Sequence, residues 1–155
     1  MILAEVDPST PEAADLIAAL DRDLNARYPG LEVHGIDVWN FREAGGVFLV
    51  GRLDIVPVAC GAFRPMQEEG VVEVKRMYVR DGHRGRGFGR AILAALEEKA
   101  TRRGYRVIRL ETGDNQPEAI ALYESAGYHR IPCYGDYASN PHSRCFEKPL
   151  QTPPR

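Results

Sequence analysis

The sequence predicts one α+β domain, built on a mixed sheet of about seven strands with helices on both faces. Three apolar segments between residues 47 and 79 are joined by short turns, which is typical of an antiparallel meander. Strand-like and helical segments then alternate, which favours a mixed sheet. A chain of 155 residues can form a core without a metal or a disulfide. We expect residues 1–150 to form the domain and residues 151–155 a short C-terminal tail.

The N-terminal part begins with a strand and a helix. Ile2–Val6 is a short apolar run that reads as a strand. Apolar residues then recur at helical spacing from Ala13 to Leu24, and the helix is expected to end near Tyr28. The segment Val33–Ala44 has no clean period, and a short helix from about Ile36 is the interpretation adopted for it.

The rest of the chain supplies six strands and two helices. The helices are expected from Phe88 to Gly104 and from Asn115 to Ala126, with a glycine at or just after each end. The strands are expected at Val47–Gly51, Val56–Arg64, Val71–Val79, Val107–Glu111, Tyr128–Ile131 and Arg144–Lys148.

Composition and charge exclude several classes of protein. The formal net charge is −2, which argues against a general nucleic-acid binder because such proteins are usually basic. No segment has the roughly 20 consecutive apolar residues that a membrane span needs. The N-terminus has no basic region followed by an apolar run, so no signal peptide is expected. These features predict a cytoplasmic protein that binds neither nucleic acid nor membrane.

The cysteines are three in number and widely spaced. Cys60, Cys133 and Cys145 form no CxxC pair and no Cys/His cluster. An odd, dispersed set is a poor disulfide framework, and the spacing does not suit zinc. We therefore expect three reduced thiols and no metal site.

The segment from Arg84 to Arg90 reads Arg-Gly-Arg-Gly-Phe-Gly-Arg, and it lies between a strand and a helix. Glycines let backbone N–H groups approach a ligand, and a helix N-terminus attracts anions. The segment is therefore a candidate pyrophosphate site, although a flexible basic turn would have the same composition. It lacks the Gly-Lys-Ser/Thr of a P-loop and the G-x-G-x-x-G spacing of a dinucleotide fold.

Three segments together resemble the Gcn5-related N-acetyltransferase (GNAT) family. Arg84-x-x-Gly87-x-Gly89 matches the family signature (Q/R)-x-x-G-x-(G/A). The preceding segment Glu73–Val79 is similar to the family's fourth strand. The segment Asn115–Tyr128 resembles the second cofactor motif, N-x-x-A-x-x-L-Y-x-x-x-G-(F/Y). The resemblance implies the acyl-CoA N-acyltransferase fold, with acetyl-coenzyme A as the acetyl donor.

The resemblance also implies the cofactor contacts. Backbone groups of the strand before the loop would bind the pantetheine arm, and the glycine loop would hold the pyrophosphate. Asn115 would bind the arm, but it could equally be a helix N-cap, with Glu118 completing a capping box. The implied set is Met77, Tyr78, Val79, Arg84, Gly85, Arg86, Gly87, Phe88, Gly89, Arg90 and Asn115.

Two residues are candidates for catalysis. Transfer of acetyl from sulfur to an amine expels a thiolate, and the family pattern places Tyr123 where a hydroxyl could protonate it. A purely structural tyrosine is the alternative. The attacking amine must lose a proton, and Glu73 lies where a glutamate serves as the base in histone-acetylating members. Glu73 could instead form a salt bridge with Lys75 or Arg64, and Glu111 is the second choice as base.

The acceptor is expected to be a primary amine of a small molecule or peptide, attacking the thioester directly. The candidate acceptor-binding residues are Tyr28, Trp39, Tyr134 and Tyr137, with Asp136, His142 and Ser143 nearby in sequence. Aromatic rings with an acid suit a cationic amine, but they also suit loop packing. The sequence leaves open a homodimer and two rival functions. One rival is a non-catalytic acetyl-coenzyme A sensor, and the other is a phosphate or nucleic-acid binder that uses the arginines from Arg80 to Arg90.

Overall fold

The computed structural model describes residues 1–29, 41 and 43–151. The helix expected from Ile36, the acceptor candidate Trp39 and the tail at 152–155 lie outside the described residues. The elements in chain order are β1 (Ile2–Glu5), α1 (Pro11–Arg27), β2 (Val47–Leu53), β3 (Val56–Pro65), β4 (Val71–Val79), α2 (Phe88–Arg102), β5 (Val107–Gly113), α3 (Pro117–Ser125), β6 (His129–Ile131), the 3-10 helix η1 (Gly135–Ser139) and β7 (Ser143–Pro149).

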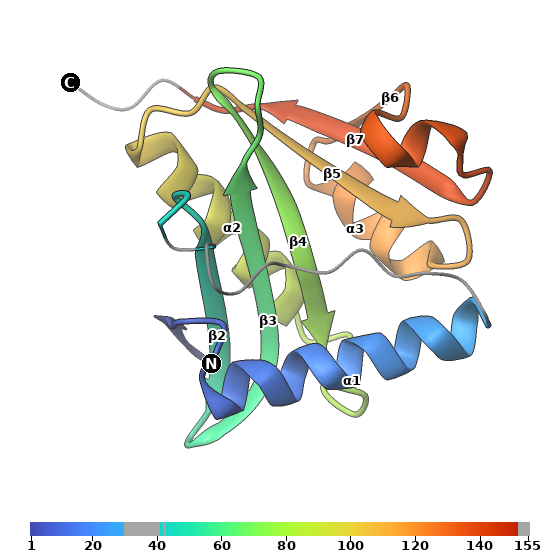
Figure 1. The fold of residues 1–155 in the computed structure, drawn as a ribbon. Coiled ribbons are helices and arrows are strands. Elements are labelled where there is room, and N and C mark those ends of the chain that lie inside the picture. The colour runs from blue at the N-terminus through green and yellow to red at the C-terminus, as the bar shows by residue number, and fades with distance from the viewer. Residues whose placement is uncertain (30–40, 42, 152–155) are drawn as a thin grey trace.

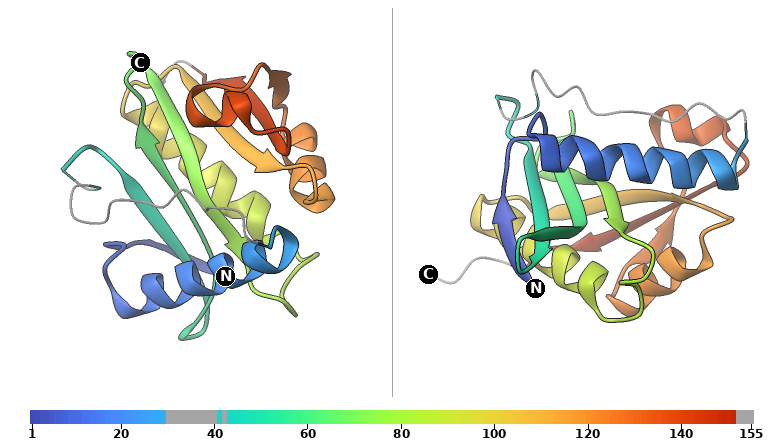
Figure 2. Two further views of the ribbon diagram at one scale, coloured as in Figure 1. Left: turned by 45° about the vertical axis from the view of Figure 1, so that its right-hand side comes forward. Right: turned by 90° about the horizontal axis from the view of Figure 1, so that it is seen from below.

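The seven strands form one mixed sheet, as the sequence predicts. Their order is β1-β2-β3-β4-β5-β7-β6, and β4 with β5 is the parallel pair. The first four strands are the predicted antiparallel meander with β1 added at its edge. Helix α1 lies across one face of the sheet, while α2 and α3 lie on the other (Figures 1 and 2). The expectation of helices on both faces is therefore confirmed.

Alternation along β2 produces a hydrophobic core on each face of the sheet. Val47 and Leu49 belong to the cluster packed against α2, whereas Phe48 and Val50 belong to the cluster packed against α1. All four side chains are at most 1% exposed. Because successive side chains of a strand point to opposite faces, an apolar run without polar breaks is what a doubly covered strand requires.

The parallel pair β4–β5 separates after a short stretch. Pairing runs from Val71↔Val107 to Glu73↔Arg109, although β4 continues to Val79 and β5 to Gly113. The two strands diverge towards α1 (Figure 1). The divergence leaves room between the C-terminal halves of two neighbouring strands in the middle of the sheet.

A β-bulge lies in β4 within this divergent half. Cys60 pairs with Tyr78 and Ala62 pairs with Lys75, so Gly61 of β3 faces both Arg76 and Met77. Arg76 has a φ of 59°, in the left-handed region that side chains rarely adopt. A Cβ on Gly61 would lie 2.5 Å from the Met77 sulfur, so only glycine fits this close approach. The bulge redirects the side chains that follow Lys75.

The expectation of three reduced thiols is wrong. Cys133 and Cys145 form a disulfide with their Cα atoms 5.1 Å apart, and Cys60 is a free, buried thiol. The two cysteines are 12 residues apart in the chain, but Ile131 pairs with Cys145 in the β6–β7 ladder. Because of this register, Cys133 lies next to β7, close to Cys145. The spacing of the cysteines in the sequence does not reveal this proximity. The disulfide closes the loop that carries η1.

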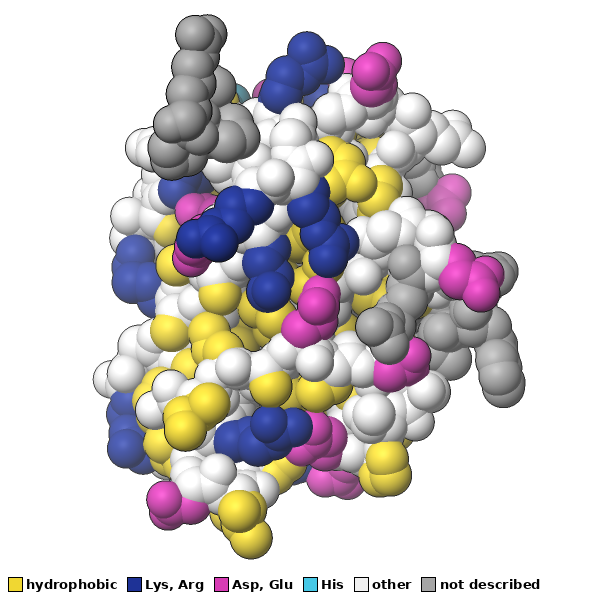
Figure 3. Space-filling model, turned by 90° about the vertical axis from the view of Figure 1, so that its left-hand side faces the viewer, with side chains coloured by type: hydrophobic (Ala, Val, Ile, Leu, Met, Phe, Trp, Pro, Cys, Tyr) yellow, Lys and Arg dark blue, Asp and Glu magenta, His cyan; other side chains and the backbone are white. Residues whose placement is uncertain are grey.

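The described surface shows neither a membrane span nor a metal cluster. No helix in the described part of the chain has the length and apolar character needed to cross a bilayer. Within residues 1–29, 41 and 43–151, no three His, Cys, Asp or Glu side chains are grouped to hold a metal ion. On the face shown in Figure 3, basic side chains lie among acidic and hydrophobic ones, without a continuous basic surface.

Loss of the disulfide is expected to lower the free energy of unfolding. Closing a loop of this length contributes about 3 kcal/mol through the entropy of the unfolded chain. Urea denaturation of the wild-type protein should therefore show this loss in a reducing buffer. The variant Cys133→Ser should be equally destabilised and should not respond to the reductant. A wild-type midpoint that does not change on reduction would contradict the disulfide.

Candidate functional site

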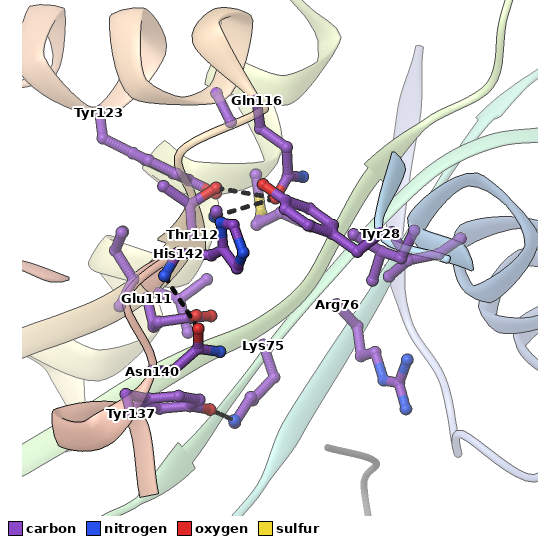
Figure 4. A pocket seen from close by; sticks show the side chains of 17 residues that line it. Tyr28, Lys75, Arg76, Glu111, Thr112, Gln116, Tyr123, Tyr137, Asn140 and His142 are labelled. Carbon is purple, nitrogen blue, oxygen red and sulfur yellow. Dashed lines mark hydrogen bonds between the residues drawn. The ribbon is translucent and has the colours of Figure 1, made fainter. Parts of the chain in front are cut away.

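A cavity opens where β4 and β5 diverge, and we call it the strand cavity. It has a volume of about 170 Å³ and includes residues of α1, β4, β5, α3 and the loop after η1. Figure 4 shows its labelled side chains around a common space. Its lining consists of Leu20, Leu24, Tyr28, Val74, Lys75, Arg76, Met77, Leu110, Glu111, Thr112, Gly113, Gln116, Ala119, Tyr123, Tyr137, Asn140 and His142.

A larger cavity runs beside it along the glycine loop, and we call it the glycine-loop cavity. Its volume is about 550 Å³, within the usual range for ligand pockets. Its lining consists of Leu20, Asp23, Arg27, Met77, Tyr78, Val79, His83, Arg84, Gly85, Gly87, Phe88, Gly89, Arg90, Gln116, Glu118, Ala119, Ala121, Leu122, Tyr123 and Ser125. Nine of the eleven sequence-predicted cofactor contacts belong to this list.

The two remaining cofactor candidates lie elsewhere. The Arg86 guanidinium stacks over the Phe88 ring at 5.0 Å from its centroid, and Arg86 is not part of the lining. The Asn115 side chain donates to the Arg27 carbonyl at 3.4 Å. The N-cap of α3 is Gln116, without a side-chain capping bond, so the proposed Asn115–Glu118 capping box is wrong.

The glycine loop has the backbone that an anion site needs. Gly85 and Gly87 have φ values of 78° and 82°, and nothing lies within 4 Å of a Cβ built on either. Gly87 is the N-cap of α2, so the free N–H groups of the first helical turn begin at the loop. Arg84 and Arg90 add positive charge to the same lining. These features suit a phosphate group.

Helices α1 and α3 meet above the glycine-loop cavity. Arg27 of α1 forms a salt bridge with Glu118 of α3 at 2.5 Å, and it donates to the Asn115 carbonyl at 3.1 Å. The Asn115 N–H donates to the Tyr28 hydroxyl at 2.7 Å. These contacts connect the C-terminal end of α1 to the N-terminal end of α3, and they explain why Asn115 faces α1.

The two cavities share part of their walls. The shared residues are Leu20, Met77, Gln116, Ala119 and Tyr123. Among these five residues, Tyr123 has a titratable side chain. It packs edge-on against Tyr128 and is 5% exposed. Burial, together with the charge of Glu111, raises the pKa of the Tyr123 hydroxyl above its ordinary value.

Glu73 is enclosed by hydrogen-bond donors and does not line either cavity. Its Oε1 is 3.3 Å from the Arg64 guanidinium and 3.5 Å from the Lys75 ammonium, and its Oε2 accepts from the Tyr134 hydroxyl at 2.8 Å. Glu73 is 3% exposed. The salt bridges that the sequence offered as the alternative to catalysis are therefore both present.

Glu111 does line the strand cavity. Its Oε2 accepts from the Ser143 hydroxyl at 2.6 Å, which ties the carboxylate to β7. Glu111 stands on β5, across the cavity from Lys75 and Arg76 on β4 (Figure 4). The weaker of the two sequence candidates is thus the carboxylate that reaches the cavity.

The predicted aromatic residues divide between the cavity wall and its support. Tyr28 and Tyr137 line the strand cavity. Tyr134 lies behind Tyr137, with ring centroids 5.6 Å apart, and does not form part of the lining. His142, which directly precedes β7, also lines the strand cavity, and its ring centroid lies 5.7 Å from that of Tyr28. Its ring nitrogen lies 3.1 Å from Asp114, and this contact lowers the pKa of the Asp114 carboxyl.

Several lining residues were not named by the motifs. Lys75 and Arg76 belong to the segment Glu73–Val79, which is similar to the family's fourth strand, and neither was given a ligand-binding role. Both lie in the cavity wall, at or next to the bulge. Gln116 lies in both linings, and its Oε1 accepts from the Gly113 N–H at 3.0 Å. The repeated charges in Glu73-Val-Lys-Arg were the available signal, because charges in a central strand rarely serve packing alone.

Comparisons with known proteins agree with this architecture. The family model described as "Acetyltransferase (GNAT) family" matches residues 13–128. An "IAA acetyltransferase" of Azospirillum brasilense is 36% identical over 148 residues, which is 96% of this chain and 97% of that protein. A solved structure from Klebsiella pneumoniae, assigned to the acyl-CoA N-acyltransferases, has a TM-score of 0.80 at 36% identity and covers 97% of both chains.

A more distant structure shares the fold alone. An aminoglycoside 6'-N-acetyltransferase complexed with coenzyme A has a TM-score of 0.74 at 17% identity and covers 100% of both chains. The family match covers more than half of the chain, and it agrees with the glycine loop, the diverging strands and the paired cavities. The chain belongs to the acetyltransferase (GNAT) family.

Proposed function

We propose that this acetyltransferase moves the acetyl group of acetyl-coenzyme A to a primary amine bound in the strand cavity. The observation that carries the proposal is the shared wall, since Tyr123 and Met77 line both the donor side and the acceptor side. The relative from Azospirillum brasilense is called an IAA acetyltransferase, and this name does not specify an amine acceptor. The amine is therefore our inference from the family and the cavity.

The glycine-loop cavity fits acetyl-coenzyme A, the co-substrate of the family. Gly85 and Gly87 leave open space for the pyrophosphate, and Arg84 and Arg90 supply positive charge. The backbone of Met77 to Val79, past the last β4–β5 pair, is assigned to the pantetheine arm. Bound there, acetyl-coenzyme A supplies an activated acetyl thioester. Arg86 and Asn115 contact lining residues but do not line the cavity themselves, and they are not assigned to the cofactor.

Tyr123 is proposed as the acid. A tyrosine hydroxyl has an ordinary pKa of about 10 and is protonated at neutral pH. Burial and the charge of Glu111 raise the pKa of Tyr123 further, so the proton is held more firmly. A hydroxyl in the wall common to both cavities can donate to the sulfur as the thiolate leaves, which helps acetyl transfer by direct attack. The chain's part in this step is to keep that proton in place and to exclude water with the surrounding Leu20 and Met77.

Glu111 is proposed as the base in preference to Glu73. An amine with an ordinary pKa near 10 is mostly protonated at neutral pH and must lose a proton before attack. Glu111 lies in the cavity wall, while both oxygens of Glu73 are occupied by Arg64, Lys75 and Tyr134. Glu73 instead fixes Lys75 and the loop that carries Tyr134.

The cellular location and the assembly of the protein stay predictions. A cytoplasmic location stays a prediction, and the Cys133–Cys145 disulfide counts against it because disulfides are rare in reducing compartments. A single domain over residues 1–150 and a homodimer likewise stay predictions.

Gly87→Asp should abolish cofactor binding. The new carboxylate would face the pyrophosphate, and like charges in contact cost several kcal/mol, which weakens affinity by roughly 100-fold or more. Calorimetric titration with coenzyme A measures this directly. Gly104→Asp is the matched control, because Gly104 also has a positive φ, of 86°, with nothing within 4 Å of its Cβ, and lies outside both cavities. Equal affinity for the two variants would remove the loop from the site.

Tyr123→Phe should lower kcat by about 100-fold or more while the coenzyme A affinity stays near the wild-type value. The readout is release of free thiol with a panel of amines at saturating acetyl-coenzyme A. Tyr128→Phe is the control, since Tyr128 is another buried tyrosine whose hydroxyl donates to Glu97 at 2.7 Å, outside both cavities. Turnover retained in Tyr123→Phe would exclude Tyr123 as the acid.

Glu111→Gln and Glu73→Gln should affect different properties. Glu111→Gln removes the base and should lower kcat/KM by about 100-fold at neutral pH, with partial recovery at higher pH, where more of the amine is neutral. Glu73→Gln leaves Arg64 and Lys75 without their carboxylate and should lower the free energy of unfolding by about 3–5 kcal/mol. Steady-state kinetics and urea denaturation on both variants separate these roles. A larger kinetic defect in a well-folded Glu73→Gln would return the base to Glu73.

A further inference from the structure

We propose that the acceptor is a small zwitterion, an amine that also carries a carboxylate, and that Lys75 is the residue that binds the carboxylate. This inference rests on the proposed function, because it names the substrate class of the same strand cavity. The α-amino acids are the simplest molecules of this class.

The charges of the strand cavity are separated across it. Two cations, Lys75 and Arg76, stand on β4, and the carboxylate of Glu111 stands on β5 (Figure 4). A ligand that carries both signs can place its amine beside Glu111 and its carboxylate beside Lys75. An acceptor with several positive charges would instead bring a cation against two buried cations, which is strongly unfavourable.

Lys75 does not have a carboxylate to itself. Its side chain is 9% exposed, and its ammonium donates to the Tyr137 hydroxyl. The Glu73 carboxylate lies 3.5 Å from this ammonium, and it also accepts from Arg64 and Tyr134. Burial lowers the pKa of Lys75 although the charges of Glu73 and Glu111 oppose this shift, so desolvation outweighs the stabilisation that the carboxylates give the ammonium. An anion in the cavity would stabilise the ammonium further.

Arg76 strengthens the positive side without being the main contact. The bulge directs it into the wall, where its side chain is 8% exposed and pairs with Asp21 of α1 at 2.5 Å. Its Nε is buried and has no hydrogen-bond partner among the described residues. Asp21 therefore holds Arg76 in place, and Lys75 is left to meet the ligand.

The size of the cavity limits the acceptor. About 170 Å³ is less than the range typical of drug-sized ligands, so the described walls admit a small molecule. The aromatic wall formed by Tyr28 and Tyr137 can pack against an apolar or aromatic side chain of that molecule.

The test compares free L-amino acids with the amides of the same amino acids at saturating acetyl-coenzyme A. The amide keeps the amine and the side chain and loses the negative charge. The best free acid should exceed its own amide in kcat/KM by at least about tenfold, as expected for a hydrogen bond to a charged group. The amide's amine is less basic and so more often neutral, which works against this result and makes it more informative.

Substitution of Lys75 should remove the preference. Lys75→Met should bring the ratio of acid to amide close to one by raising KM for the acid, while the amide is affected little. Lys75→Arg should retain most of the ratio. Lys148→Met is the matched control, because Lys148 also pairs with one glutamate, Glu97 at 3.0 Å, outside both cavities. An amide that equals or exceeds its acid in the wild-type protein would overturn the proposal.

Binding separates this inference from the proposed function. If no amine is acetylated, the proposed function has failed, and the same acids and amides are titrated calorimetrically into the protein loaded with coenzyme A. Tighter binding of an acid that is lost in Lys75→Met still supports the carboxylate site. Binding of neither compound, or equal binding of both, rejects it.

Discussion

The β4–β5 ladder ends early, and both cavities depend on that ending. After Glu73↔Arg109 the two central strands separate, so the middle of the sheet is open at one end while its other end remains a packed core. A sheet that stayed paired to Val79 would fill the space with side chains and backbone. The meander on one side and the β5–β7 pair on the other keep the two halves rigid, with seven paired positions between β5 and β7 alone. The opening is thus held by well-packed walls, which is the arrangement that precise substrate placement needs.

The bulge at Arg76 and Met77 determines what the opening presents. At the bulge, two residues of β4 face the single residue Gly61 of β3, and the absence of a side chain on Gly61 allows the two strands to approach closely. As a result, Arg76 lies in the wall of the strand cavity, and Met77 lies in the wall that both cavities share. Glu73 and Tyr134 lie behind that wall, and the Glu73 carboxylate contacts Lys75, which belongs to it. A half-compensated charge in such a place is costly for stability. Functional sites are where proteins retain that kind of cost.

The sequence predicts the fold and the position of the glycine loop well, because those depend on local patterns. Val71–Val79 has the predicted bounds, and the glycine loop leads into α2 as expected. The acceptor side depends on contacts between distant segments. The spacing of Cys133 and Cys145 could not show the β6–β7 register that joins them. Glu73 and Glu111 looked alike as mid-strand acids, and the position where pairing stops decides which one reaches the cavity. Asn115 matched a motif, but the packing of α1 against α3 turns its side chain towards Arg27.

The wall common to both cavities has a thermodynamic consequence. Under the proposed function, both ligands would contact a shared surface, which consists of Leu20, Met77, Gln116, Ala119 and Tyr123. Any change that one ligand makes in this surface would therefore alter the affinity for the other. Linkage then requires that the factor by which the donor changes acceptor affinity equals the factor by which the acceptor changes donor affinity. Helix α1 adds to this coupling because it borders both cavities through Leu20 and is held to α3 by Arg27. If the two cavities bind donor and acceptor as proposed, the affinities of the two ligands are thermodynamically coupled through this wall.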